Sequence, residues 1–174
     1  MRDVISAIEG EYRRYRTLGR GAMGQLSGGQ LCTRVSAESL SVAMIVWHLS
    51  GNFKSRFTDF LTTDGEKAWR ERDDEFSVRT VTGDEVIARW DEGWDILVET
   101  LGGLTDEKLS RVVLVRGVEL TVVEALERSL GHTAYHVGQI TFLGKMLTGE
   151  GWDYLSIRPG GTAAYNANPT HEKM

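Results

Sequence analysis

Cysteine is nearly absent from this chain of 174 residues, since Cys32 is the only one. A single cysteine cannot form an intrachain disulfide bond, so the fold has no covalent cross-link of that kind. Such a composition is typical of a reducing compartment, and we expect a cytoplasmic protein. No base or metal ligand stands beside Cys32 in the sequence, which favours a packing role for it over that of a nucleophile.

Long basic runs and long apolar runs are missing as well. The formal net charge is −5, and the nearest cluster of basic residues, Arg13 to Arg16, is interrupted by Tyr15 and preceded by acidic residues, as on a solvated helix face. Binding to nucleic acid is therefore not expected. No stretch approaches the ~18 uninterrupted apolar residues of a membrane-spanning helix. The N-terminus is amphipathic and charged, unlike a signal peptide.

Helical spacing of apolar residues is present in four long segments. We expect helices at about 2–26, 39–61, 82–101 and 121–147. Ser39 is the expected N-cap of the second helix. The third helix opens at Thr82 and Glu85, which have the spacing of a capping box, and the fourth opens in the same way at Thr121 and Glu124.

Two connections between these helices shape the expected topology. The polar stretch 62–80 is long for a loop without structure of its own, and such loops are usually functional or cross over a bundle. The stretch 111–120 predicts a small β-hairpin that turns at Arg116 and Gly117, between the third and fourth helices. We therefore predict an all-α fold, a four-helix bundle with long crossover connections.

The composition, with 41% hydrophobic residues, suits one domain with a core of its own. We expect a single domain over 1–174, with the helical bundle at about 1–148. The remaining segment, 149–174, is rich in glycine and asparagine and is expected to be irregular. It contains large apolar residues such as Trp152 and Tyr154, which favours a tail that packs against the bundle.

Three of the four histidines lie where a helical bundle could direct them to one point. His132 and His136 are four residues apart, so they stack on one face of their helix, away from its charged side. His48 lies on a polar stripe of the second helix, beside the apolar face. Three neutral imidazoles with an open fourth position form a catalytic type of divalent-metal site, most often for zinc. His171, near the C-terminus, is expected to be solvated.

Other polar residues share these two helix faces with the histidines. A polar stripe gains nothing from burial unless its members have partners, and a metal-binding histidine needs an acceptor for its second nitrogen. The candidates for holding the histidines or a substrate are Asn52, Ser55, Arg56, Asp59, Arg128 and Gln139. Glu92 or Asp95 of the third helix are further candidate partners for the histidine nitrogens.

Two alternatives stay open on these residues. Buried histidines are more often hydrogen-bonded core residues than ligands, so a cluster without a metal is the alternative to a metal site. In the long loop, Trp69, Arg70 and Arg72 could clamp a carboxylate or a phosphate. The loop arginines could instead pair with the acidic residues around them and hold the loop to the bundle.

At these residues the chain resembles the DinB/YfiT-like superfamily, and more closely one subfamily of unknown function. The resemblance is carried by 47–76 and 131–140, and its helical frame covers most of the chain. It implies a four-helix bundle in which three histidines hold a divalent metal, matched here one by one by His48, His132 and His136. It also implies a zinc or nickel ion and a homodimer.

The same resemblance implies thiol chemistry, because characterised relatives transfer low-molecular-weight thiols such as bacillithiol or mycothiol, or isomerise a thiol adduct. An open metal position can lower the pKa of a bound water to about 7, or bind a substrate thiol as the thiolate. We therefore expect a metal-dependent enzyme acting on a small molecule, either a thiol S-transferase or a related hydrolase. The alternative is a non-catalytic dimeric bundle that binds a metal or a small ligand.

Overall fold

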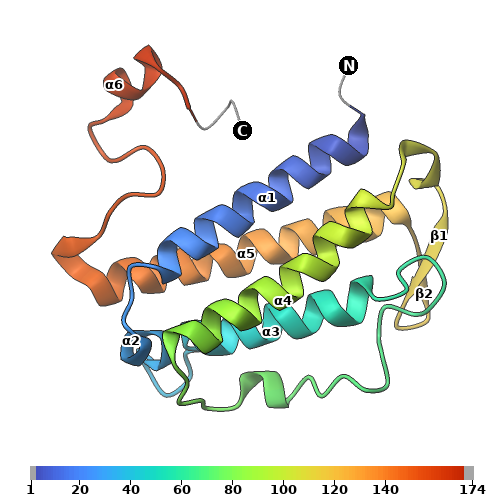
Figure 1. The fold of residues 1–174 in the computed structure, drawn as a ribbon, viewed down its shortest axis with the longest axis horizontal. Coiled ribbons are helices and arrows are strands. Elements are labelled where there is room, and N and C mark those ends of the chain that lie inside the picture. The colour runs from blue at the N-terminus through green and yellow to red at the C-terminus, as the bar shows by residue number, and fades with distance from the viewer. Residues whose placement is uncertain (1–2, 171–174) are drawn as a thin grey trace.

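The structure, a computed structural model, describes residues 3–170 and is mostly helical. The four long helices are α1 (Val4–Met23), α3 (Val42–Phe57), α4 (Gly83–Gly102) and α5 (Val122–Thr148). They form a bundle in which α3 packs mainly against α4, and α1 against α5 (Figure 1). Figure 1 also shows that α3 and α4 run in the same direction, as do α1 and α5, which is the predicted crossover topology. Within the described residues, no helix is long and apolar enough to cross a membrane.

Shorter elements connect the long helices. These are α2 (Gly28–Cys32), η1 (Asp74–Phe76), η2 (Asp106–Lys108), β1 (Val112–Val115), β2 (Val118–Thr121), η3 (Gly149–Gly151) and α6 (Thr162–Ala167). The two strands form an antiparallel hairpin between α4 and α5, in which Val115 pairs with Val118 next to the turn. Arg116 and Gly117 make that turn with φ angles of 57° and 73°, as a two-residue hairpin of this kind requires. The all-α fold with a small hairpin is therefore confirmed.

Capping boxes set where α4 and α5 begin. The hydroxyl of Thr82 accepts the N–H of Glu85, and the carboxylate of Glu85 accepts the N–H of Thr82. Thr121 and Glu124 make the same reciprocal pair at the start of α5. Both boxes lie where the sequence predicts them, because a capping box is a local device that needs only residues three positions apart.

The boundaries of α3 differ from the predicted ones at both ends. Its N-cap is Ser41 rather than Ser39, because the hydroxyl of Ser41 accepts the N–H of Met44. The helix ends at Phe57, before the expected end near residue 61. Asp59 follows with a φ of 51°, a left-handed conformation that cannot continue a right-handed helix.

Aromatic side chains from three helices form the centre of the core. Trp90 and Trp94 of α4, Tyr12 of α1 and Phe53 of α3 are all fully buried. The ring centroids of Phe53 and Trp94 lie 5.0 Å apart. Gly19 of α1 makes room for this packing, since a Cβ there would lie 2.4 Å from the ring of Trp90. The tyrosine hydroxyl donates to a backbone carbonyl of α5, so the core also fixes the helix that carries two of the histidines.

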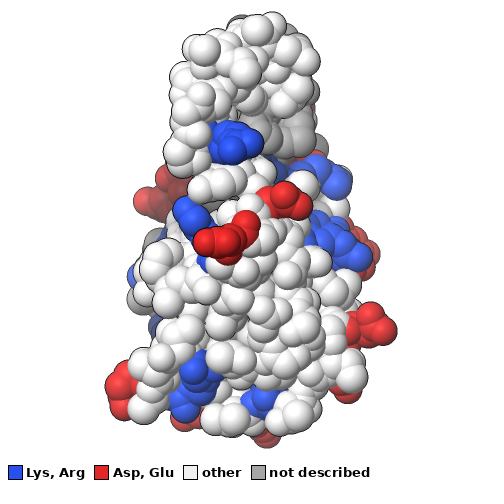
Figure 2. Space-filling view, turned by 90° about the vertical axis from the view of Figure 1, so that its left-hand side faces the viewer, with Lys and Arg blue, Asp and Glu red and all other residues white. Residues whose placement is uncertain are grey.

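The tail after α5 packs against the bundle only at its start. Trp152 is buried against Gly144 of α5, and Leu155 is half-buried next to Gly21 of α1. Tyr154 and Ile157 are 44% and 40% exposed, and α6 has no buried residue. Beyond the first residues the structure therefore differs from the expected packed tail, because Tyr154 and Ile157 remain exposed rather than buried against the bundle. Figure 2 shows the tail projecting above the bundle, with few charged side chains on it.

Candidate metal centre

His48 lies on the inner side of α3 and is 4% exposed. Its Nδ1 lies 2.9 Å from a carboxylate oxygen of Glu75 in η1. Because an ionised carboxylate can only accept, Nδ1 carries a proton, and the neutral ring then has its lone pair on Nε2. That Nε2 lies 3.1 Å from Nε2 of His132 on α5.

The histidines of α5 meet His48 in the space between the two helices. The ring centroid of His48 is 5.1 Å from that of His132 and 4.9 Å from that of His136. One ring nitrogen from each of the three lies within 4.8 Å of the others. Nitrogens bound to one tetrahedral ion at about 2.0–2.1 Å are about 3.3 Å apart, so small ring shifts suffice. The three predicted ligands converge and could hold a metal ion.

Hydrogen bonds outside the cluster hold its two ends. Nδ1 of His136 lies 2.8 Å from the side-chain oxygen of Gln139, whose amide nitrogen lies 3.2 Å from the hydroxyl of Tyr135. On the other side, Glu75 accepts two hydrogen bonds from Arg70, at 2.8 and 2.9 Å. Partners of this kind fix the tautomer and orientation of metal-binding histidines. Of the predicted partner residues, Gln139 is the one that contacts a histidine of the cluster.

The two histidines of α5 are neutral at ordinary pH. Burial, together with the neighbouring His136 and His48, lowers the pKa of His132 to about 3. Burial and His48 lower the pKa of His136 to about 4, although its hydrogen bond to Gln139 opposes that shift. Neutral imidazole is the form that binds a metal, so no proton has to leave these rings first.

One buried nitrogen tests whether hydrogen bonds alone explain the cluster. Nδ1 of His132 is buried and has no hydrogen-bond partner among the residues that the structure describes. An unpaired buried polar group costs free energy, so a metal-free cluster of hydrogen-bonded histidines would be incompletely satisfied. An ion bound through Nε2 would leave this nitrogen unpaired as well, so the fit rests on the donor set: three imidazole nitrogens in one place are ligands that zinc and nickel accept. The residues therefore fit a divalent ion.

A cavity of about 340 Å³ opens beside the cluster, and both His48 and His132 line it. Three of the predicted polar residues, Asn52, Arg56 and Arg128, line the same cavity. They come from α3 and α5, the two helices that carry the histidines. The polar stripes predicted on these helices therefore do face a common space, although neither Arg56 nor Arg128 is a partner of a histidine nitrogen.

Ser55 and Asp59 do not reach the cluster. Ser55 is buried, but its hydroxyl donates to the carbonyl of Gly65 at 2.7 Å and so anchors the long loop. Asp59 is exposed and lies beyond the end of α3. Its predicted alignment with His48 assumed a longer helix, and the left-handed turn at this position removes it.

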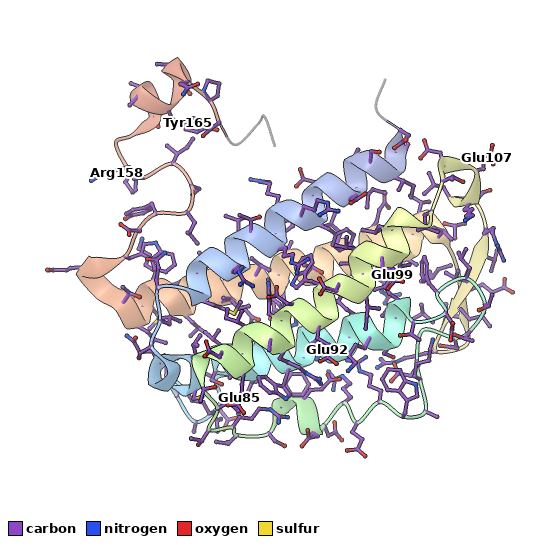
Figure 3. The ribbon with its side chains drawn as sticks, viewed as in Figure 1. Glu85, Glu92, Glu99, Glu107, Arg158 and Tyr165 are labelled. Carbon is purple, nitrogen blue, oxygen red and sulfur yellow. The ribbon has the colours of Figure 1, made fainter. Side chains whose placement is uncertain are left out.

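The predicted carboxylate partners on α4 are also wrong. Glu92 forms an ion pair with Lys54 at 2.5 Å, and Asp95 forms one with Arg16 at 2.9 Å. Figure 3 shows Glu92 on α4, in a row of glutamates along that helix. These carboxylates are used in pairs between helices at the surface, so they are not available to the histidines.

Glu75 takes the place that the sequence analysis gave to α4. From the sequence alone, Glu75 is only one of the acidic residues around the loop arginines that could pair with them. Burial opposes its ionisation, but hydrogen bonds from His48 and Arg70 outweigh burial and lower the pKa of its carboxyl. A signal for it exists in the sequence, because Gly51 lies inside α3 about one turn after His48. A Cβ at position 51 would lie 2.0 Å from the carboxylate of Glu75, so a larger residue there would displace this carboxylate from its present position.

The loop arginines divide between the two alternatives that the sequence left open. Arg70 forms the ion pair with Glu75, which ties the loop to the histidine on α3. Arg72 has no such ion pair with any described residue, and both arginines line the cavity. Trp69 is 56% exposed and does not border the cavity.

A protein-family model described as "Protein of unknown function (DUF1572)" matches residues 1–161. The chain belongs to this family. The match takes in all four long helices and the three histidines, so the DUF1572 unit includes the whole candidate metal centre. No curated protein is similar enough in sequence to count as a match.

Proposed function

We propose that this DUF1572 protein is a divalent-metal-dependent enzyme that acts on a small molecule, with zinc or nickel held by His48, His132 and His136. The observation that carries the proposal is the convergence of three imidazole nitrogens within 4.8 Å of one another, beside a cavity of about 340 Å³. Structural zinc sites usually have four protein ligands, whereas three ligands leave a position open for a substrate. The resemblance to DinB/YfiT-like bundles supports the same assignment.

The reaction that we propose first is the transfer of a low-molecular-weight thiol to an electrophilic carbon. A bound divalent ion supplies Lewis acidity, which favours the deprotonated form of a thiol or a water. The thiol sulfur forms the new bond with its own electron pair, the leaving group departs with the pair of the broken bond, and the thiol proton passes to solvent. The choice of a thiol rests on the resemblance, and a related hydrolase would use water in its place.

The protein's own residues prepare this centre. Glu75 accepts a hydrogen bond from the Nδ1–H of His48, which leaves the Nε2 of that ring available to a metal. The side-chain oxygen of Gln139 lies at Nδ1 of His136 in the same manner. Arg70 pairs with Glu75, so the carboxylate next to the ligand is itself held in place. The cavity gives a small molecule access to the centre from the side that His48 and His132 line.

Metal analysis of the untagged protein tests the centre. We expect about one zinc or nickel ion per chain, as a three-histidine site binds one ion, and its loss in His48→Ala and His132→Ala. The matched control is His171→Ala, which removes the fourth histidine of the sequence, outside the described residues. Mass spectrometry of dialysed protein measures the metal, and circular dichroism shows whether each variant is folded. Wild-type protein that neither contains nor takes up either metal would refute the proposal.

A screen of low-molecular-weight thiols against electrophiles tests the reaction. We expect the metal-loaded protein to consume the thiol faster than chelator-treated protein and faster than His48→Ala, with the thiol followed by a colorimetric reagent. Full metal content without turnover of any thiol pair or any ester or amide would favour the alternative, a metal-binding bundle without catalysis.

We also propose a homodimer, formed through the exposed face of α5. Tyr135, Phe142 and Met146 share this face at helical spacing and are 63%, 65% and 52% exposed. A row of large exposed apolar side chains on one helix is typical of an interaction surface. Light scattering after size-exclusion chromatography is expected to give the mass of two chains, and Phe142→Glu is expected to give one. A monomeric wild-type protein would contradict the proposal.

A further inference from the structure

The cavity beside the histidines carries an excess of positive charge. Five arginines line it and no aspartate or glutamate does. They are Arg56 on α3, Arg70 and Arg72 in the loop before η1, Arg116 at the hairpin turn and Arg128 on α5. The chain as a whole has a formal net charge of −5, so this concentration of cations is local.

Three of the five arginines share two carboxylates. Arg70 is paired with Glu75, and both Arg56 and Arg116 are paired with Glu66, at 3.1 and 3.0 Å. Burial lowers the pKa of Arg56, and the nearby Arg70 and Arg116 lower it further against the opposing effect of Glu66. Three positive charges therefore face two negative charges, so these carboxylates do not neutralise the remaining two arginines as well.

Arg72 and Arg128 have no acidic partner in the part of the chain that the structure describes. The guanidinium of Arg72 lies 5.0 Å from the ring centroid of Phe76, whose ring lies 4.6 Å from that of His48. Arg128 precedes His132 by one turn on the same face of α5, which is about 6 Å along the helix axis. Both arginines are exposed residues that border the cavity beside the histidines without a carboxylate partner among the residues described.

The rest of the cavity wall is largely apolar. Phe57 and Phe60 line it from the end of α3, and Leu114, Val118 and Leu120 line it from the hairpin. Leu114 and Val118 are 41% and 57% exposed, although both are large apolar side chains. A mostly apolar wall with a few convergent charged groups is typical of a small-molecule site.

We propose that the cavity binds the substrate of the metal centre by an oxyanion, a carboxylate or a phosphate, held by Arg72 and Arg128, with its hydrocarbon part against the hairpin. The link to the metal centre rests on the proposed function, while the anion site rests on the arginines themselves. A guanidinium binds either oxyanion through paired N–H donors, and an uncharged or cationic ligand would leave the excess positive charge uncompensated. The reacting atom of the substrate would lie at the histidines, about one helical turn from its oxyanion.

Three small probes test the charge requirement. They are benzoate, phenyl phosphate and benzamide, which is the uncharged counterpart of benzoate. Isothermal titration calorimetry is done on the full chain after removal of metal, so that no anion can bind to an ion. We expect benzoate or phenyl phosphate to bind at least about tenfold more tightly than benzamide, as charge-assisted hydrogen bonds require. The tighter anion identifies the oxyanion.

Two substitutions assign the anion to its arginines. Arg72→Gln and Arg128→Gln are each expected to weaken anion binding about tenfold. The matched control Arg14→Gln removes a surface charge of α1 and is expected to leave binding unchanged, and thermal melts show that all variants fold. Equal anion binding by wild type and the double variant would overturn the proposal. So would equal binding of benzoate and benzamide, or no anion binding at millimolar concentration.

The outcome is independent of the metal experiment. Arginine-dependent anion binding in a protein that takes up no zinc or nickel would support this anion site and refute the proposed enzyme. Metal uptake without anion binding would refute this site alone.

Discussion

Two irregular segments, the loop 58–82 and the tail 152–170, differ both in charge and in their position in the structure: 11 of the 25 loop residues are charged, against 2 of the 19 tail residues. Both are polar stretches with a few large apolar residues. The loop returns along α3 (Figure 1) and reaches the histidine centre through Glu75 and the hairpin through Asp64. The tail contacts the bundle around Trp152 and then leaves it.

Paired polar groups account for the difference. The carboxylate of Asp64 accepts the backbone N–H groups of Glu66, Arg116 and Gly117, at 2.7, 2.8 and 2.7 Å. In the tail from residue 154 to 170, the single charged side chain is Arg158, which is exposed (Figure 3). The loop is held to the bundle and the hairpin by charged side chains with fixed partners. The tail has few such partners after Trp152, and Tyr154 and Ile157 stay exposed.

Among the variants of the loop and the tail, Glu75→Ala is expected to cause the largest loss of stability and of metal binding. It leaves the side chain of Arg70, which is 2% exposed, without its two short hydrogen bonds and with only the more distant carboxylate of Glu66, at 3.9 Å. Breaking such a pair costs about 3–5 kcal/mol of stability, and loss of the histidine's partner weakens metal binding about 10–100-fold. Urea unfolding of the metal-free protein and a zinc titration measure the two effects. Glu75→Gln keeps the shape of the side chain and one acceptor oxygen, so its stability and zinc affinity are expected to lie between those of the wild type and Glu75→Ala. An unchanged unfolding free energy in Glu75→Ala would show that other contacts hold the loop.

Trp152→Ala tests the one anchored part of the tail. Removing this buried ring from its place on Gly144 is expected to cost about 3 kcal/mol of stability. Zinc affinity is expected to stay the same, since the contact lies beyond the histidines on α5. A parallel loss of metal binding, measured in the same titration, would mean that the tail and the centre are coupled.

Asp64→Ala removes the hydrogen bonds that link the loop to the hairpin. We expect a smaller loss of unfolding free energy than in Glu75→Ala or Trp152→Ala, because this site is partly solvated. Backbone N–H groups of Glu66 and Gly117 lower the pKa of Asp64 from its ordinary 3.8. Because the pKa is lower in the folded chain than in the unfolded chain, the ionised carboxylate stabilises the fold. This contribution is complete at pH values above 3.8 and is lost as the pH falls through the lowered pKa of the folded state. The variant is expected to be about 1 kcal/mol less stable at neutral pH. Urea unfolding is expected to show this difference shrinking in strong acid, and a constant difference would exclude the charge as its cause.

Ile157→Ser is expected to have the smallest effect. The side chain is 40% exposed, so the change in unfolding free energy is expected to stay within about 0.5 kcal/mol. Thermal unfolding measures it. A larger loss would show that the tail packs in solution more closely than it does here.

Much of the fold and the metal centre could be predicted because their signals are local. The capping boxes at Thr82 and Thr121 span three residues each, and the four-residue spacing of His132 and His136 fixes their common face. The length of the loop alone indicated a crossover. That His48 joins them from another helix was an assumption based on its polar stripe and on the family resemblance, because no local signal brings two helices together.

The remaining features depend on contacts between distant parts of the chain. Several acidic residues of the loop could have met His48, and tertiary packing selects Glu75, 27 positions away. Asp59 was misplaced because a helical projection cannot show where the helix stops. The excess of arginine at the cavity likewise arises only when α3, the loop, the hairpin and α5 come together.

The parallel arrangement of α3 and α4 also affects the order in which the chain can fold during synthesis. His48 is synthesised long before its partners on α5, and the loop has to return along α3 before α4 can pack. Contacts of such long sequence separation form slowly, since chain closure precedes any gain from them. A nascent chain that ends before Val122 therefore has the first histidine and its glutamate but neither histidine of α5, so the three-histidine cluster that could hold a metal is complete only at the last stage of folding.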